Sequence, residues 1–84
     1  MELENARNEI NDIDKEIVKL LEKRFTLVLQ VGRYKKKNSV PVYDEKREKA
    51  VIENCVNNLE NKTYSREVEM IFKQIMDSCK ELEK

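Results

Sequence analysis

The fold of this chain is decided by residues 20–35, which read LLEKRFTLVLQVGRYK. Leucine and valine recur there at steps of three and four, and the same spacing extends back through Leu3, Ala6, Ile10, Ile13 and Ile17. This pattern is typical of one apolar face of a long helix. Arg24 occupies the position that follows Leu20 in the rhythm. Because a guanidinium keeps its charge, an arginine in a buried seam either reaches water or meets an anion.

The spacing of apolar residues predicts three helices, one much longer than the other two. The first covers about residues 3–36 and ends where the segment 40–42, Val-Pro-Val, favours an extended connection. Asp44 is a good N-cap for the second helix, because its carboxylate can accept from the first free backbone N–H groups. After a polar break at residues 61–63, the third helix starts near Ser65 and continues at helical spacing to the end of the chain.

Size and composition predict one all-α domain, residues 1–84, that associates with a second copy. Charged residues make up 40% of the chain, and it holds one Gly and one Pro, which favours long helices. A first helix of about 50 Å is not covered along its length by helices of about 16 and 19 residues. The remaining apolar seam is expected to face the long helix of another chain, which predicts an intertwined homodimer.

Charge and rare residues exclude several classes of function. The net charge is zero, with 17 basic and 17 acidic residues, which argues against binding to nucleic acid or to an anionic membrane. No membrane-spanning run or signal peptide is recognisable, so a cytoplasmic location is expected. Cys55 and Cys79 lie at apolar helical positions, which favours buried free thiols. The chain has no histidine, and no metal or cofactor is expected.

Charged residues lie at the edges of the predicted apolar faces. Arg24 and Lys35 flank one apolar patch of the first helix. Asp44 and Glu48 continue the apolar face of the second helix toward its start, and Arg47 lies beside them. Cations on one helix and carboxylates on another could enclose a small polar anion.

Each of these residues also has a simpler interpretation. Arg24 could extend to water or fix the register of the helices, and Lys35 could be a solvated member of a lysine-rich run. Asp44 is an N-cap in either case, and Glu48 could pair with Arg47 or Arg24. Arg7 lies about 42 Å from Lys35 along the helix, so it could serve the same pocket only in an antiparallel partner.

The order of these residues resembles that of the all-helical (type II) chorismate mutases. The matching pattern comprises Arg7, Ile13-Asp14, Leu20-Leu21-x-x-Arg24, Val31-Gly32-x-x-Lys35, Pro41-Val42-x-Asp44-x-x-Arg47-Glu48, and Phe72 seven residues before Cys79. It covers nearly the whole chain without an insertion. The resemblance implies a homodimer with two active sites, each built from three helices of one subunit and an arginine of the other. It also implies conversion of chorismate to prephenate, a step toward phenylalanine and tyrosine.

The resemblance implies roles for single residues. Arg24 and the partner subunit's Arg7 would clamp the two substrate carboxylates, and Lys35 would hydrogen-bond the ether oxygen and a carboxylate. Glu48, with the Asp44 region, would hold the substrate hydroxyl. The reaction is an intramolecular Claisen rearrangement, so these groups act by electrostatic clamping and conformational restriction, without covalent catalysis.

Three further residues complete the implied site, and two of them depart from the commonest family pattern. Arg47 would add positive potential and orient Glu48. Cys79 stands where a serine usually lies near a substrate carboxylate, and Glu83 stands where a glutamine usually donates to the ether oxygen. An ionised glutamate only accepts hydrogen bonds, so Glu83 would serve when protonated. Activity is therefore expected to rise as the pH falls from neutral.

Other functions fit the same features. An isochorismate-pyruvate lyase of the same fold would use the same cations on a related dianion. A non-catalytic helical dimerisation or regulatory module would use Arg24 and Glu48 only as an ion pair. A nucleic-acid-binding three-helix domain is disfavoured by the zero net charge and by the length of the first helix.

Overall fold

The computed structural model describes residues 2–84, which form three α-helices and one short 3-10 turn, with no β-strand. The helices are α1 (Leu3–Lys37), α2 (Glu45–Asn57) and α3 (Ser65–Glu83), and the 3-10 turn is Lys62–Tyr64. The predicted all-α class is confirmed, as is the presence of one long and two shorter helices in this part of the chain.

Local sequence explains where the helices begin and end. After α1, Ser39 adopts a left-handed backbone conformation with φ of 56°, which stops the helix. The carboxylate of Asp44 accepts a hydrogen bond from the backbone N–H of Arg47 at 3.0 Å, which confirms the predicted N-cap of α2. Helix α2 ends at Asn57, so Leu59, which continues its apolar spacing, lies just beyond the helix.

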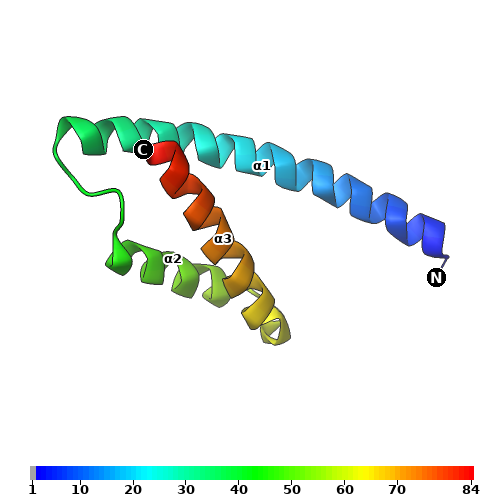
Figure 1. The fold of residues 1–84 in the computed structure, drawn as a ribbon. Coiled ribbons are helices and arrows are strands. Elements are labelled where there is room, and N and C mark those ends of the chain that lie inside the picture. Colours follow the sequence, from blue (N-terminus) through cyan, green and yellow to red (C-terminus); the bar gives the residue numbers. More distant parts are fainter. Residues whose placement is uncertain (1) are drawn as a thin grey trace.

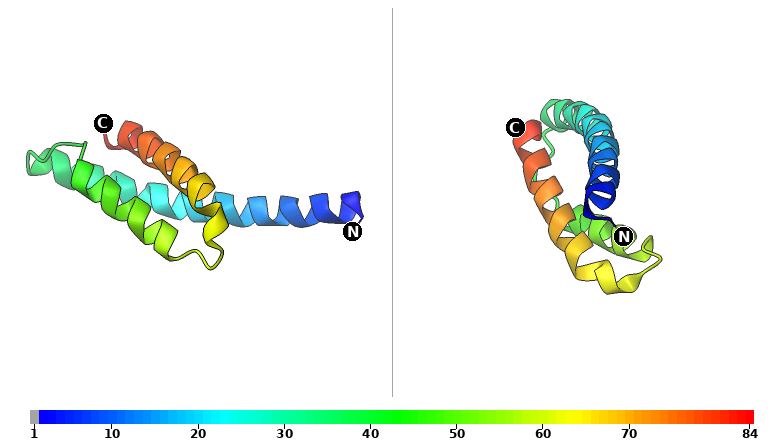
Figure 2. Two further views of the ribbon diagram at one scale, coloured as in Figure 1. Left: turned by 90° about the horizontal axis from the view of Figure 1, so that it is seen from below. Right: turned by 90° about the vertical axis from the view of Figure 1, so that its right-hand side faces the viewer.

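The helices form an elongated arrangement in which α3 connects the other two. Helix α3 packs against both α1 and α2, and its C-terminal end lies beside the second half of α1 (Figure 1). The first half of α1 projects beyond both shorter helices, as the left-hand view of Figure 2 shows. The molecule therefore extends over 54 × 24 × 16 Å. None of the helices described is both long enough and apolar enough to cross a bilayer.

The hydrophobic core of the single chain is small. Its buried hydrophobic residues, among those described, are Val51, Met76 and Cys79. The apolar seam of α1 remains between 45% and 62% exposed at Leu3, Ile10, Ile13, Leu20, Leu27 and Val31. An apolar surface of this extent marks an interaction site in a soluble protein.

Helices α1 and α3 approach each other closely at Gly32, which is buried. A Cβ atom at this position would lie 2.9 Å from Cα and 3.2 Å from the carbonyl oxygen of Glu83. Backbone atoms cannot move aside as a flexible side chain does. The missing side chain of Gly32 therefore allows the last turn of α3 to lie against α1.

Replacing Gly32 with alanine is expected to lower the thermal unfolding midpoint. Alanine gains about 1 kcal/mol of helix propensity over glycine, but overpacking against a backbone costs about 1–3 kcal/mol and separates the helices. Circular dichroism at 222 nm measures the midpoint, with Arg33→Ala on the exposed side of the same turn as control. A midpoint that rises in Gly32→Ala would contradict this close approach.

Candidate functional site

A cavity of about 290 Å³ lies between the second half of α1, the start of α2 and the second half of α3. Its volume is near the lower end for small-molecule pockets, which is about 300 Å³. The apolar part of its lining consists of Leu27, Val28, Val31, Val51 and Met76. The charged part consists of Arg24, Lys35, Arg47 and Glu83. With three cations and one carboxylate, this lining attracts an anion.

Arg24 directs its guanidinium toward α3. Its Nη1 atom donates a hydrogen bond to the sulfur of Cys79, at 3.0 Å. A thiol is a weak acceptor, and this bond uses one of five guanidinium N–H donors. None of the ion pairs formed by residues 2–84 includes Arg24. A half-buried guanidinium with donors to spare is therefore available to an anionic ligand.

Lys35 and Glu83 form the most buried ion pair of the described chain, with side chains 16% and 9% exposed. Lys35 Nζ lies 2.7 Å from Glu83 Oε1 and donates a hydrogen bond to the carbonyl oxygen of Val42 at 2.9 Å. The contact with Glu83 is short but not aligned as a hydrogen bond, so Oε1 accepts none within the described residues. Lys35 thus ties α1 to the segment before α2 and to the end of α3.

Cys79 lies on α3 beside Arg24, although it is not among the residues that line the cavity. Burial raises the pKa of its thiol, while the charge and hydrogen bond of Arg24 lower it and Glu83 adds a smaller increase. The thiol form therefore dominates near neutral pH, which makes Cys79 a hydrogen-bonding group and a poor nucleophile. Both cysteines are free, but the expected burial holds for Cys79 only, since Cys55 is half-buried.

Glu48 lies at the junction of α2 and α3, and it does not line the cavity that holds Arg24. Its Oε2 atom is 2.9 Å from Nζ of Lys80 on α3. Arg47, which was expected to orient Glu48, forms no ion pair with it in the described chain, and Lys80 takes that place. The sequence analysis did not identify Lys80. The feature that could have identified it is its position four residues after Met76 and three before Glu83, which places this cation on the same face of α3 as both.

Glu48 instead lines a second, larger hollow of about 410 Å³ between α2 and α3. Met76 lines both hollows, so the two meet at its side chain. The charged lining of the larger hollow consists of Glu45, Glu48, Glu53, Glu69, Lys49 and Lys73. This excess of carboxylates repels an anion, so we assign the candidate site to the smaller cavity.

Four expected site residues do not line this cavity: Glu48 and Cys79, described above, and Asp44 and Arg7. Asp44 is exposed, and its carboxylate caps α2. Arg7 lies in the projecting half of α1, with its side chain 63% exposed and 3.7 Å from a carboxylate oxygen of Glu4. It is about 25 Å from Arg24 along the helix, so it cannot reach the cavity of its own chain. The role of Arg7 stays a prediction that depends on a second copy.

The sequence is similar to known proteins over nearly its whole length. Residues 6–84 match the family described as chorismate mutase type II. The chain is 32% identical over 88 residues to a bifunctional chorismate mutase/prephenate dehydratase of Aquifex aeolicus, covering 99% of this chain and 24% of that protein. It is 48% identical over 56 residues to a protein of the same description in Buchnera aphidicola subsp. Schizaphis graminum, covering 67% of this chain and 14% of that protein.

A third relative is the T-protein of Haemophilus influenzae, which is 39% identical over 51 residues, covering 61% of this chain and 14% of that protein. The chain thus spans less than a quarter of the length of each of these three relatives. The match over residues 6–84 shows that the chain belongs to the type II chorismate mutase family. The resemblance inferred from the order of residues is confirmed.

The two cysteines are expected to react at different rates with iodoacetamide near neutral pH. Cys55 should be alkylated at least about tenfold faster, because burial and the raised pKa of Cys79 leave little accessible thiolate at that site. Peptide mapping by mass spectrometry gives both rates, and Cys55→Ser should leave only the slow reaction. The rate at Cys79 should increase with pH as the thiol ionises. Equal rates at the two sites would contradict the described environment of Cys79.

Proposed function

We propose that this chain catalyses the rearrangement of chorismate to prephenate, on the route to phenylalanine and tyrosine. The observation that carries the proposal is the cavity in which Arg24, Lys35 and Arg47 converge with a single carboxylate. Membership of the type II chorismate mutase family supports the same reaction. The rearrangement breaks an ether C–O bond and forms a C–C bond within one molecule. The protein therefore needs to hold the substrate in the reactive shape and to stabilise its charge, and it needs no nucleophile.

The residues of the cavity suit those two demands. The guanidinium of Arg24 would hold one substrate carboxylate through paired hydrogen bonds. The ammonium of Lys35, fixed by its contacts with Val42 and Glu83, would stabilise the negative charge that develops on the ether oxygen. In the proposed dimer, the aliphatic lining would exclude water from around the bound substrate, which would strengthen both interactions.

The carboxylates would act on the remaining polar groups of the substrate. Glu48, which lines the adjoining hollow that meets the cavity at Met76, is assigned to the substrate hydroxyl, with Asp44 at the start of the same helix. Glu83, 2.7 Å from Lys35, would face the ether oxygen together with that lysine and would donate to it when protonated. Cys79 would lie near the carboxylate held by Arg24.

A second copy of the chain would complete the site. The exposed apolar seam of α1 supports packing of two long helices against each other. In an antiparallel pair, the projecting end of one α1 would bring the partner subunit's Arg7 to the cavity and supply the second carboxylate clamp. The dimer would thus explain both the exposed seam and the distance of Arg7 from its own cavity.

Chorismate mixed with the purified chain is expected to lose its diene absorbance, with prephenate as the product. Arg24→Ala should lower kcat/KM by about 10²–10³-fold, because it removes the guanidinium donors that would hold a substrate carboxylate. Circular dichroism should show that this variant still folds, and Arg33→Ala should keep wild-type activity. Release of pyruvate from isochorismate, with chorismate unchanged, would instead identify a lyase. No turnover of either substrate would support a non-catalytic module.

Mixing two inactive variants is expected to restore activity if the partner completes the site. Arg7→Ala and Arg24→Ala each disable every site of their own homodimer. A mixed dimer contains one intact site, so random reassortment should return about a quarter of the wild-type activity. The mixture is denatured, refolded and assayed with chorismate, and each variant refolded alone is the control. Failure to recover activity, with mixed dimers shown by mass spectrometry, would contradict the shared site.

A further inference from the structure

We propose that Lys80 is a positioning residue, which acts by holding the carboxylate of Glu48 at the junction of α2 and α3. The inference rests on the proposed function, in which Glu48 contacts the substrate hydroxyl. It assigns to Lys80 the orienting role that the family resemblance implied for Arg47.

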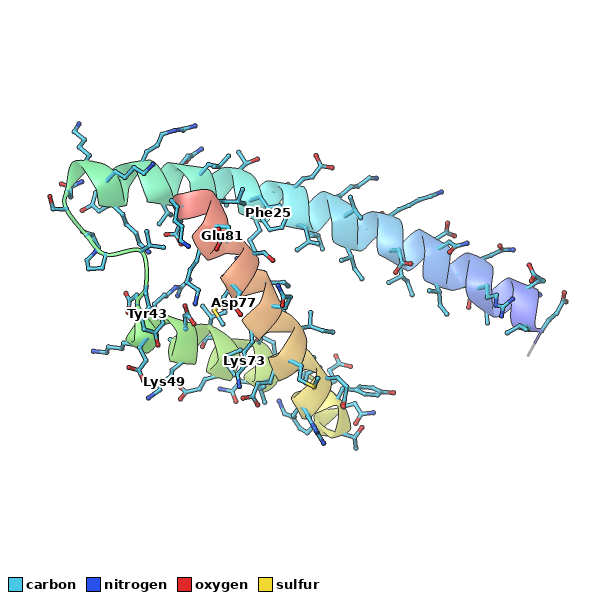
Figure 3. All side chains as sticks on the ribbon, in the orientation of Figure 1. Phe25, Tyr43, Lys49, Lys73, Asp77 and Glu81 are labelled. Atoms are coloured by element: carbon cyan, nitrogen blue, oxygen red, sulfur yellow. The ribbon has the colours of Figure 1, made fainter. Side chains whose placement is uncertain are left out.

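The ammonium group of Lys80 is held by groups from three segments of the chain. It lies 2.9 Å from Glu48 Oε2 on α2 and 3.1 Å from Asp77 Oδ1 on α3. It also lies 5.0 Å from the ring centroid of Tyr43, in the segment before α2, which is a cation–π distance. Figure 3 shows Tyr43 at the start of α2 and Asp77 on α3. Lys80 thus fastens the start of α2 to the C-terminal half of α3.

The Lys80–Glu48 pair lies between residues that line the cavity. Met76 and Glu83 are four residues before and three residues after Lys80, on the same face of α3, and both line the cavity. On α2, Glu48 is next to Arg47 and one turn before Val51, which also line it. The pair therefore closes the junction of the two helices at the edge of the candidate site.

This pair differs from the surface ion pairs of the same helices. Lys80 and Glu48 are 25% and 26% exposed and join two helices. Lys73 and Glu69, by contrast, are 64% and 45% exposed and lie one turn apart on α3. Exposed pairs within one helix contribute little to structure because water competes for both charges. The half-buried pair can fix the relative position of α2 and α3.

The geometry leaves Glu48 able to bind a second donor. Among residues 2–84, the one ion pair that Glu48 forms is the contact of its Oε2 atom with Lys80. An ionised carboxylate can accept from several donors at once. Hydrogen bonds to Glu48 and Asp77 raise the pKa of Lys80, so its ammonium charge persists through neutral pH. Asp77 and Tyr43 keep Lys80 in place while Glu48 engages the substrate.

Lys80→Met tests this role, with Lys73→Met as the matched control. Both substitutions remove one lysine charge from α3, but only the first releases Glu48. We expect Lys80→Met to lower kcat/KM by about tenfold or more, since small displacements of binding groups carry penalties of that size. Lys73→Met should resemble the wild type. Lys80→Arg, which keeps the charge, should recover part of the loss, and circular dichroism reports whether each variant folds.

A double-mutant cycle separates positioning from a general loss of stability. If Lys80 acts through Glu48, then Lys80→Met should have little further effect on kcat/KM in a Glu48→Gln chain. An active wild type in which Lys80→Met matches Lys73→Met, or in which the two losses are additive, would overturn the positioning role alone. A wild type without mutase activity would overturn the proposed function and this role with it.

Discussion

The close approach of α3 to α1 determines where the charged groups of the cavity lie. Gly32 leaves room for the backbone of Glu83, and the carboxylate of Glu83 then meets Lys35 at 2.7 Å. Cys79, one turn earlier on α3, reaches Arg24 at 3.0 Å. Because α3 also packs on α2, the position of Arg47 relative to α1 depends on the same contact. A different separation of α1 and α3 would disperse these groups.

The balance of charge among the residues that line the cavity explains why it suits an anion. Lys35 is matched by Glu83, but the only partner that the described chain offers to Arg24 is a thiol. A partly desolvated guanidinium beside a neutral acceptor is costly for a folded protein. A carboxylate ligand would offset that cost, whereas a protein that used Arg24 only for stability would gain more from an internal carboxylate. The unneutralised charge therefore supports the proposed role of Arg24 in binding an anion.

Sequence periodicity predicted those features that depend on a single helix. The step of three and four residues located α1, and the interruption at Arg24 located the cavity that this residue lines. The cap at Asp44 was also predictable, because it depends on a contact with Arg47 only three residues away. The Lys80–Glu48 contact was not, because it depends on how α2 and α3 cross. The assignment of substrate roles, including those of Glu48 and Glu83, stays a prediction.

The projecting half of α1 adds a constraint on length. In the proposed dimer, one uninterrupted helix would carry a contact for the neighbouring subunit near one end and the lining of its own cavity near the other. A helix turns by about 100° and advances about 1.5 Å with every residue. Inserting or deleting a single residue between Arg7 and Arg24 would therefore turn Arg7 away from the cavity of the neighbouring subunit, although both halves of α1 would remain helical. Between these two arginines, helix α1 would therefore accommodate substitutions more easily than changes in the number of residues.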